Sequence, residues 1–248
     1  MIRRIIIVAR SEFKAFWGGA SGGLALAVFL GLGGLWFYNG VAIYALDHLK
    51  AMAQGGAVDA SIHLFSGGLT NLGVLVMAVT PLTTMRAFAI SSAGGHYDLL
   101  RALPLKRLEL VAGLHLSACA CLGLLVLLGL TPFIVLLGMG VGSPMVIVTA
   151  ALGLGLLVVA FSAVGLAVSS RTLTSLASAL TTLGVLGFLW AMGWAAPYLS
   201  PAVGAAIQGL AFEPRLSHFT MGVLDFNDLV YFLALTLGAH LLIGPVRD

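Results

Sequence analysis

Residues whose types and spacing could support catalysis are few, and the best pair is a serine and a histidine far apart in the chain. The sequence Gly19-Ala20-Ser21-Gly22 spells GxSG where an apolar run begins, and His240 lies in the last apolar run. With both on one side of a membrane, they could form the dyad of an intramembrane serine hydrolase. However, GxSG arises easily among 32 glycines, and no oxyanion hole is recognisable. We therefore expect no catalytic residues, with Ser21 permitting close packing and His240 capping a helix or reaching toward the interface.

Metal-ligand patterns are also missing from the sequence. Six histidines are present, namely His48, His63, His96, His115, His218 and His240. They show no HxxxH or other ligand spacing, so a metal site would have to be assembled from distant segments. His115 lies inside an apolar run, where a hydrogen-bonded structural role is expected and a polar path is the alternative. Cys119 and Cys121 would point to different faces of a helix, so we expect apolar filler and neither a disulfide nor a metal site.

The basic residues exclude two further classes of function. A P-loop requires the pattern GxxxxGK[ST], and the lysines, Lys14, Lys50 and Lys106, all lie outside such a setting. We therefore expect the chain itself to bind no nucleotide. A nucleic-acid partner is not expected either, because the basic residues are spread out and form no aromatic-laced patch.

The elements that must position these side chains are transmembrane helices. Hydrophobic residues make up 60% of the 248 residues and charged residues only 8%, whereas soluble domains carry about 25% charged residues. Residues 18–46, 116–170 and 172–212 contain no Asp, Glu, Lys, Arg or His. Because about 20 apolar residues cross the hydrocarbon core of a bilayer, the sequence predicts an all-α integral membrane protein with a single transmembrane domain over residues 1–248.

Six transmembrane helices account for the apolar runs. They are predicted over residues 20–44, 68–90, 109–137, 145–168, 173–198 and 226–244. Prolines and glycines interrupt residues 199–225, which we interpret as short interfacial or re-entrant pieces. No acidic residue lies at the middle of a predicted span, which disfavours coupling to protons or sodium. Energy for any transport would therefore come from elsewhere.

Residues 1–17 are predicted to form an amphipathic helix in the headgroup region. Its apolar stripe comprises Ile2, Ile5, Ile6, Ala9, Phe13, Phe16 and Trp17. The apolar core over residues 5–9 is too short for a cleaved signal peptide. Glycines follow at GxxxG spacing at the start of the first span and recur in later spans. We expect them to allow close packing within one subunit, with a subunit interface or a moving gate as the alternative.

The distribution of basic residues predicts the orientation. All but Lys50 and Arg215 of the twelve fall on one predicted side, namely Arg3, Arg4, Arg10, Lys14, Arg86, Arg101, Lys106, Arg107, Arg171 and Arg247. We therefore predict that both termini are cytoplasmic, and that residues 81–107 form a cytoplasmic excursion between the second and third spans.

This excursion contains a second amphipathic element. Pro81 is expected to open or kink the end of the second span, and Gly94 and Gly95 break the helix. Residues 96–103 are predicted to form a short amphipathic helix, which Pro104 ends. So short a helix is not stable alone, so it requires the membrane surface or the groove of a partner.

At these residues the chain resembles the permease subunits of type-2 ABC exporters, specifically the gliding-motility ABC transporter permeases. That family reads approximately MRxFAEEKRxGTxELLxxxPV after its second span, and the matching residues are Met85, Arg86, Phe88, Ala89, Gly95, Leu99, Leu100 and Pro104, with Asp98 in place of Glu. A second pattern, FSxGVIDLxDxxYFLSLT, is matched by Phe219, Gly222, Val223, Asp225, Asp228, Tyr231, Phe232, Leu233, Leu235 and Thr236. The chain departs from the family at Ile90, Ser91, Ser92, Ala93 and His96. The family has charged residues in that stretch, so this chain is not expected to form salt bridges from it to an ATPase. The short helix is still expected.

The resemblance implies a coupling helix over residues 91–104, carried by Gly95, His96, Tyr97, Asp98, Leu99, Leu100, Leu103 and Pro104. It would lie in a groove of a separate cytoplasmic ATPase subunit, present in two copies, which binds the ATP and magnesium. A second permease subunit, identical or related, would complete a translocation path between the two. The path would be lined by the first, second and fifth spans, with Asn39, Asn71, Thr181 and Thr182 as polar candidates.

Further expectations follow from the same resemblance. Residues 199–225 would form an outer gate, an accessory subunit with an extracytoplasmic domain is plausible in this family, and the chain would lie in the bacterial cytoplasmic membrane. Two alternatives to transport remain. One is an ATPase-coupled scaffold or mechanical coupler, and the other is the serine hydrolase described above. For residues 91–104 the alternative is a loop lying on the lipid surface.

Overall fold

The computed structural model describes residues 2–56, 61–88 and 106–243, and every regular element in those ranges is a helix. In chain order the helices are α1 (Ile2–Trp17), α2 (Ala20–Ala53), η1 (Ser61–Ser66), α3 (Gly67–Thr84), α5 (Arg107–Gly138), α6 (Pro144–Ser169), α7 (Ser175–Ala195), η2 (Ala196–Tyr198), α8 (Pro201–Leu210), α9 (Phe212–Thr220) and α10 (Phe226–Leu242). The predicted all-α fold is therefore confirmed for the described residues.

Five helical segments are long and apolar enough to cross a membrane. They are Ala20–Ala53, Leu64–Thr84, Arg107–Gly138, Pro144–Ser169 and Ser175–Tyr198. The predicted sixth span corresponds to α10, which has 17 residues. At about 1.5 Å per residue α10 is somewhat shorter than the hydrocarbon core of about 30 Å, so its crossing stays a prediction. The chain has the helices of a multi-pass membrane protein.

Helix α2 extends beyond the first predicted span, which ends at residue 44, and the boundary of the span itself stays a prediction. Helix α2 continues to Ala53, and Lys50 pairs with Asp47 on its last turns at 3.2 Å. The helix runs on because no glycine or proline interrupts residues 41–53. Gly55, with a φ of +74°, then provides the left-handed conformation that suits a helix end.

Helix α3 ends before residue 90, where the second span is predicted to end. Pro81 lies inside α3 as expected, but the helix ends at Thr84 and a turn follows. The hydroxyls of Thr83 and Thr84 both donate to the carbonyl of Thr80, at 2.8 and 3.1 Å. Such side-chain bonds compete with helical backbone bonding and favour termination here. Residues 89–90 lie outside the described residues.

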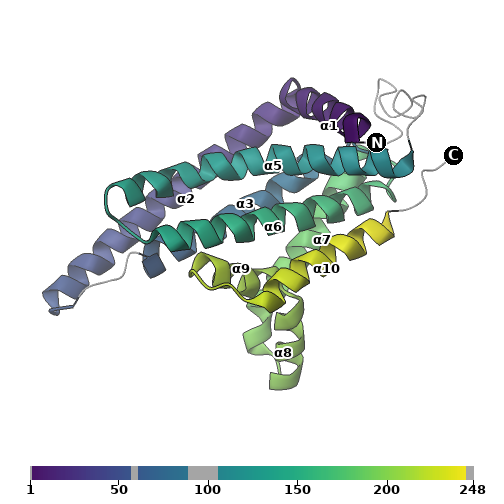
Figure 1. The fold of residues 1–248 in the computed structure, drawn as a ribbon. Helices are drawn as coiled ribbons and strands as arrows, with labels where there is room; N and C mark the ends of the chain where they lie inside the picture. Colours follow the sequence, from purple (N-terminus) through teal and green to yellow (C-terminus); the bar gives the residue numbers. More distant parts are fainter. Residues whose placement is uncertain (1, 57–60, 89–105, 244–248) are drawn as a thin grey trace.

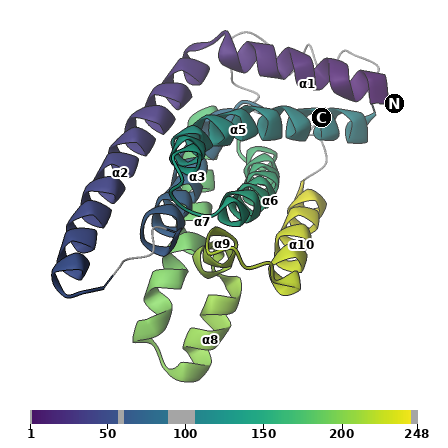
Figure 2. The same ribbon diagram turned by 60° about the vertical axis from the view of Figure 1, so that its left-hand side comes forward.

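Helices α3 and α6 form the centre of the bundle, and the other long helices surround them (Figures 1 and 2). In the most apolar part of each helix, 61% of the residues of α3 and α6 are buried, against 17% for α2 and 28% for α7. The core includes Val76 and Val79 of α3 and Leu157 and Phe161 of α6. Much of the apolar surface of α2 and α7 is therefore left for lipid or for another subunit.

Helix α1 runs alongside the first half of α5 (Figure 2). Arg4 lies 3.6 Å from Glu109, and a methyl group on Gly113 would lie only 2.7 Å from Cβ of Val8. Because of this contact Val8 is buried, although the predicted apolar stripe omitted it. Ile2 and Ile6, which belong to that stripe, are exposed. The amphipathic helix is confirmed, its contact face is corrected, and its placement among lipid headgroups stays a prediction.

The segment after α7 is broken into short helices as predicted. Helix α8 protrudes from the body of the molecule, whereas α9 lies against the bundle (Figure 1). Phe212, Leu216 and Phe219 of α9 are fully buried. Gly153 makes room for them, because a methyl group there would lie 2.6 Å from Cβ of Phe219. Helix α9 is thus part of the core and not a surface piece.

The glycines of the predicted spans fall into two groups. A methyl group on Gly22 or Gly153 would lie 2.6 Å from a neighbouring atom, as expected for close packing. A methyl group on any of a second set would meet open space, namely Gly23, Gly31, Gly34, Gly155, Gly184 and Gly187. This second set faces outward, where lipid or a second subunit would lie.

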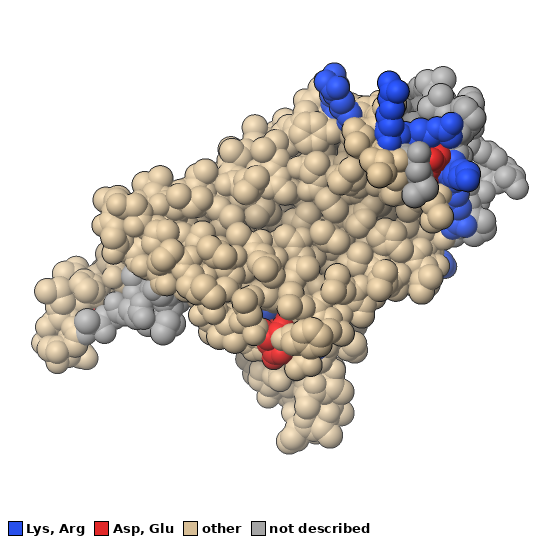
Figure 3. Space-filling view, in the orientation of Figure 1, with Lys and Arg blue, Asp and Glu red and all other residues tan. Residues whose placement is uncertain are grey.

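Basic side chains gather at the end of the bundle that carries the N-terminus of α1 (Figure 3). Two of them bind the end of α10, since Arg171 donates to the carbonyl of Leu242 at 2.8 and 3.0 Å and Arg107 donates to that of Ile243. Cations at a helix C-terminus satisfy carbonyls that have no helical partner. The predicted grouping at one end is therefore confirmed for the described basic residues, and the side of the membrane stays a prediction. Arg101 and Arg247 lie outside the described residues.

Candidate functional site

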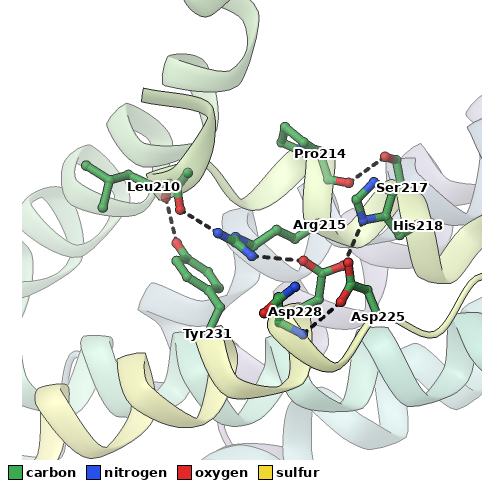
Figure 4. Close-up of polar contacts among 10 residues, drawn as sticks. Leu210, Pro214, Arg215, Ser217, His218, Asp225, Asp228 and Tyr231 are labelled. Carbon is green, nitrogen blue, oxygen red and sulfur yellow. Dashed lines mark hydrogen bonds and ion pairs between the residues drawn. The ribbon is translucent and has the colours of Figure 1, made fainter. Parts of the chain in front are cut away.

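A buried carboxylate, which belongs to the second sequence motif, joins α10 to α9 through an ion pair and a hydrogen bond (Figure 4). Asp228, in the first turn of α10, is 2% exposed. One of its oxygens accepts a hydrogen bond from Arg215 Nη1 at 2.9 Å, and the other lies 2.7 Å from His218 Nδ1. Both oxygens of the acid are thus paired, as a buried charge requires.

Arg215 itself is held on several sides. Its Nη2 donates to the carbonyl of Gly209 at 2.7 Å, and its guanidinium lies 4.1 Å from the centre of the Tyr231 ring. The Tyr231 hydroxyl donates to the carbonyl of Leu210 at 2.6 Å. Arg215 and Tyr231 therefore bind the last carbonyls of α8, so the network connects α8, α9 and α10.

The remaining motif residues shape the turn between α9 and α10. Gly222 has a φ of +87°, which only glycine adopts without strain. Asp225 caps α10 by accepting a hydrogen bond from the backbone N–H of Asn227 at 2.9 Å. Phe219 is fully buried. These four residues of the second motif, with Asp228, Asp225, Gly222 and Phe219 as ion-pair acceptor, helix cap, turn glycine and core side chain, therefore all have structural roles.

The same residues include a group with metal-ligand chemistry. Ligand atoms of His218, Asp225 and Asp228 lie within 4.8 Å of one another. A cation bound there would compete with Arg215 for Asp228, and like charges in one site repel. We therefore assign the group to ion pairing. Spacing rules missed it because its members come from two helices separated by a turn.

The polar residues predicted to line a path are not brought together within one chain. Asn71 lines a groove of about 110 Å³ with residues of α2, α3 and α5. Asn39 and Thr181 are exposed on α2 and α7. Thr182 is fully buried, and its hydroxyl has no hydrogen-bond partner among the described residues. Any continuous path would need surfaces from a second subunit.

Ser21 and His240 do not form a dyad among the described residues. Ser21 lines a cavity with residues of α1, α3 and α5. The ring of His240 packs against that of His115, with centroids 4.6 Å apart, and its Nδ1 lies 2.8 Å from the carbonyl of Thr236. Helices α2 and α10 lie on opposite sides of α5 and α6 (Figure 2). The geometry therefore offers no support for the serine hydrolase.

The polar residues within α5 are structural. His115 Nε2 lies 3.1 Å from the carbonyl of Val159, which agrees with the predicted hydrogen-bonded role. Cys119 and Cys121 are free thiols, and Cys119 Sγ lies 3.2 Å from the hydroxyl of Ser162. The expected absence of a disulfide between the two cysteines is confirmed.

The predicted coupling residues, from Gly95 to Pro104, lie outside the described residues, but both flanks are defined. On one side the backbone N–H of Phe88 donates to the hydroxyl of Ser169 at 3.3 Å. On the other, the backbone N–H of Lys106 donates to Glu109 at 3.1 Å, which caps α5. Met85 is half-buried and Arg86 is exposed. The chain thus leaves and rejoins the bundle at its basic end.

Comparison with models of known protein families and with curated proteins gives no match to this sequence.

Proposed function

We propose that the chain is the transmembrane permease subunit of an ATP-driven ABC exporter. Two motifs support this proposal, one at residues 85–104 and one at residues 219–236. In this role the chain would pair with a second permease and with two cytoplasmic ATPase subunits that bind ATP and magnesium. Alternating access between the two permeases would move a substrate across the bacterial cytoplasmic membrane.

The observation that carries the proposal is the position of the excursion between α3 and α5. Phe88 is anchored to the end of α6, and Lys106 begins α5, both at the end where the basic residues gather. Basic residues favour the cytoplasmic face of a membrane. A helix between these anchors would therefore meet a cytoplasmic ATPase, and the anchors would pass its displacement to α3, α5 and α6.

The test is co-purification of an ATPase with tagged protein in detergent. Wild type is compared with a Leu99→Asp, Leu100→Asp double variant, which places two charges on the apolar face of the predicted coupling helix. We expect an ATPase to accompany the wild type and to be lost from the double variant. Met139→Asp is a matched control, because Met139 is exposed at the far end of α5 and should leave the ATPase bound.

The contradicting result is a monodisperse wild-type protein that brings down no ATPase when purified from the cells that make it naturally. Equal recovery of the ATPase with the double variant would locate the contact elsewhere and remove residues 91–104 from the proposal. Both substitutions of the double variant lie in the excursion between α3 and α5. An elution volume in gel filtration equal to that of the wild type would therefore show that the double variant has folded.

A mechanical coupler is the second candidate, because the polar path residues do not converge within one chain. Asn39 and Thr181 are exposed on different helices, whereas Thr182 is buried against the bundle. Such a protein would bind the same ATPase but transmit force to a partner. Stimulation of ATP hydrolysis by a purified solute would support transport, and stimulation only by a partner protein would support coupling.

A further inference from the structure

A groove of about 110 Å³ lies where α2, α3 and α5 meet, and its size suits one aromatic ring. A cavity of about 150 Å³ between apolar side chains is large enough to hold benzene. The groove opens outward, because Leu30, Gly34 and Thr131 line it and are exposed. Aromatic side chains and glycines form most of the rest of its wall. The groove therefore has room for about one ring that enters from outside the bundle.

The groove also contains a side-chain amide without a partner. Asn71 of α3 lines it, and this amide makes no hydrogen bond with another described residue. Asn71 lies seven residues after the start of the apolar segment Leu64–Thr84, which is about 10 Å along the helix. At that depth in a membrane the lipid chains offer no hydrogen-bonding group, and an unpaired polar group is costly. The groove thus suits an occupant that combines a ring with a hydrogen-bonding group.

Tyr38 of α2 combines these two features and is itself without a partner. The residue is 70% exposed, and its hydroxyl makes no hydrogen bond with another described residue. It lies one helical turn after Gly34, which lines the groove. A tyrosine hydroxyl can donate to the oxygen of an amide and accept from its nitrogen. Tyr38 therefore complements Asn71 in both shape and hydrogen bonding.

The tyrosine and the amide lie at the same depth in the bundle. Helices α2 and α3 run antiparallel: methyl groups on Gly33 and Gly40 would lie 3.3 Å from Leu75 and 3.5 Å from Leu64. Asn71 falls between the two leucines, so its level corresponds to a position between the two glycines. The tyrosine belongs to the same interval, and its ring points back toward the start of α2, as helical side chains do.

A second copy of the chain can bring these groups together. Copies that insert in one orientation are related by a two-fold axis along the membrane normal, which places equal depths side by side. Helix α2 is free to approach, because only 17% of its most apolar part is buried. Methyl groups on Gly23, Gly31 and Gly34 would meet open space, and small residues let helices pack closely.

We propose that the groove receives Tyr38 of a second copy of this chain, in a two-fold symmetric dimer. The hydroxyl of each Tyr38 bonds the Asn71 amide of the other copy, so both polar groups are satisfied within the membrane. This rests on the proposed function, which requires a second permease, and it identifies that permease as an identical copy.

The test places a photoreactive group at the position of the hydroxyl. Tyr38 is replaced by p-azidophenylalanine, and native membranes that contain the complete chain are illuminated. We expect a product with the mass of two chains, in which the probe is joined to groove residues 68–75 or 128–133. The same probe at Phe188, which is 67% exposed on α7, should react without labelling the groove.

Matched variants test the groove and the hydrogen bond separately. Gly34→Leu narrows the mouth of the groove, whereas Gly184→Leu adds the same side chain at an equally open position of α7. The two-chain product should be lost from the first and kept in the second. Asn71→Leu removes both symmetric bonds and should weaken the dimer about tenfold, at about threefold for each bond. Energy transfer between two labelled copies in detergent measures this affinity, and elution volume in gel filtration shows which variants remain folded.

Several products would overturn the proposal. Labelling of the groove within one chain would mean that Tyr38 turns into its own groove. Labelling of lipid alone, or of a different protein, would assign the groove to that occupant. So would the absence of a two-chain product in membranes where the probe at Phe188 reacts. The ATPase test stays separate: an ATPase that co-purifies without the groove product contradicts only the dimer contact, and the groove product without an ATPase contradicts only the permease role.

Discussion

The two charged regions of the molecule use charge in opposite ways. At the basic end the side chains lie mostly on the surface, and Arg107 and Arg171 bind carbonyls at the end of α10. At the junction of α9 and α10, one carboxylate is buried and paired with both Arg215 and His218. Exposed charges interact weakly, whereas a buried pair loses much if one partner is removed. Buried charge therefore holds the irregular segment in place, whereas surface charge is predicted to orient the protein in the membrane.

The irregular segment needs such support because its helices are short. Helices α8 and α9 have 10 and 9 residues, fewer than the 12–15 or so at which an isolated helix becomes even marginally stable. Burial of Phe212, Leu216 and Phe219 holds α9 against α6 and its neighbours. Arg215 then ties the end of α8 to Asp228 of α10.

The largest expected effect comes from removing the buried acid. Asp228→Ala leaves Arg215 unpaired in a mostly buried position and should lower the free energy of unfolding by about 3–5 kcal/mol. Unfolding in detergent, followed by circular dichroism, measures the change. The matched change at an exposed pair is Asp47→Ala, which removes the partner of Lys50 and should cost less than about 1 kcal/mol.

A double variant sharpens the same prediction. Arg215→Met combined with Asp228→Leu replaces both charges by apolar groups and should recover much of the loss, since neither charge is then left alone. If Asp228→Ala and Asp47→Ala proved equally mild, the junction would not depend on its ion pair, and the contrast between the two regions would fail.

The next effect concerns the packing that holds α9. Gly153→Ala places a methyl group 2.6 Å from Cβ of Phe219, an atom fixed to the backbone that cannot move aside. Such overpacking should cost about 1–3 kcal/mol of stability. Gly155→Ala, on an open face of the same helix, should leave stability unchanged or slightly raised. Thermal unfolding of the two variants side by side provides the measurement, and equal behaviour would contradict the assigned position of α9.

A smaller effect is expected from the helix cap at the basic end. Arg171→Gln removes the cation that binds the carbonyl of Leu242, and should cost about 0.3–1 kcal/mol. The loss should be local, because only the last turn of α10 is affected. Hydrogen exchange of the α10 amides measures it, with faster exchange confined to residues 239–243. Faster exchange along the whole helix would show that the basic end carries more of the fold than its exposure indicates.

The smallest effect on stability is expected at Lys50. Lys50→Cys removes an exposed ion pair and should change the free energy of unfolding by less than about 0.5 kcal/mol. It provides a topology readout together with Lys14→Cys at the basic end. A membrane-impermeant thiol reagent applied outside intact cells should label Lys50→Cys and spare Lys14→Cys. The reverse pattern would invert the predicted orientation.

The candidate sites show where sequence reasoning succeeds and where it stops. Asp225 and Asp228 were selected through a motif, but their roles as a cap and as a buried ion-pair acceptor needed coordinates. The sequence alone could not show that Arg215 and His218 pair with Asp228, because spacing along the chain does not tell which helix faces meet. The cavity that Ser21 lines could not be predicted for the same reason, since its walls come from distant segments of the chain.

The sequence by itself determined that the described part of the chain is helical, with the helices of a multi-pass membrane protein, roughly where the long helices lie, and that most of the described basic residues gather at one end. These properties depend on composition and on local runs, which hydropathy measures directly. Only the tertiary structure decided which faces are buried, that α9 belongs to the core, that α1 follows α5, and which glycines make close contacts. The physical reason is that lipid and the protein interior are similarly apolar, so the spans are hydrophobic on all sides and their sequence does not distinguish the inner face from the outer.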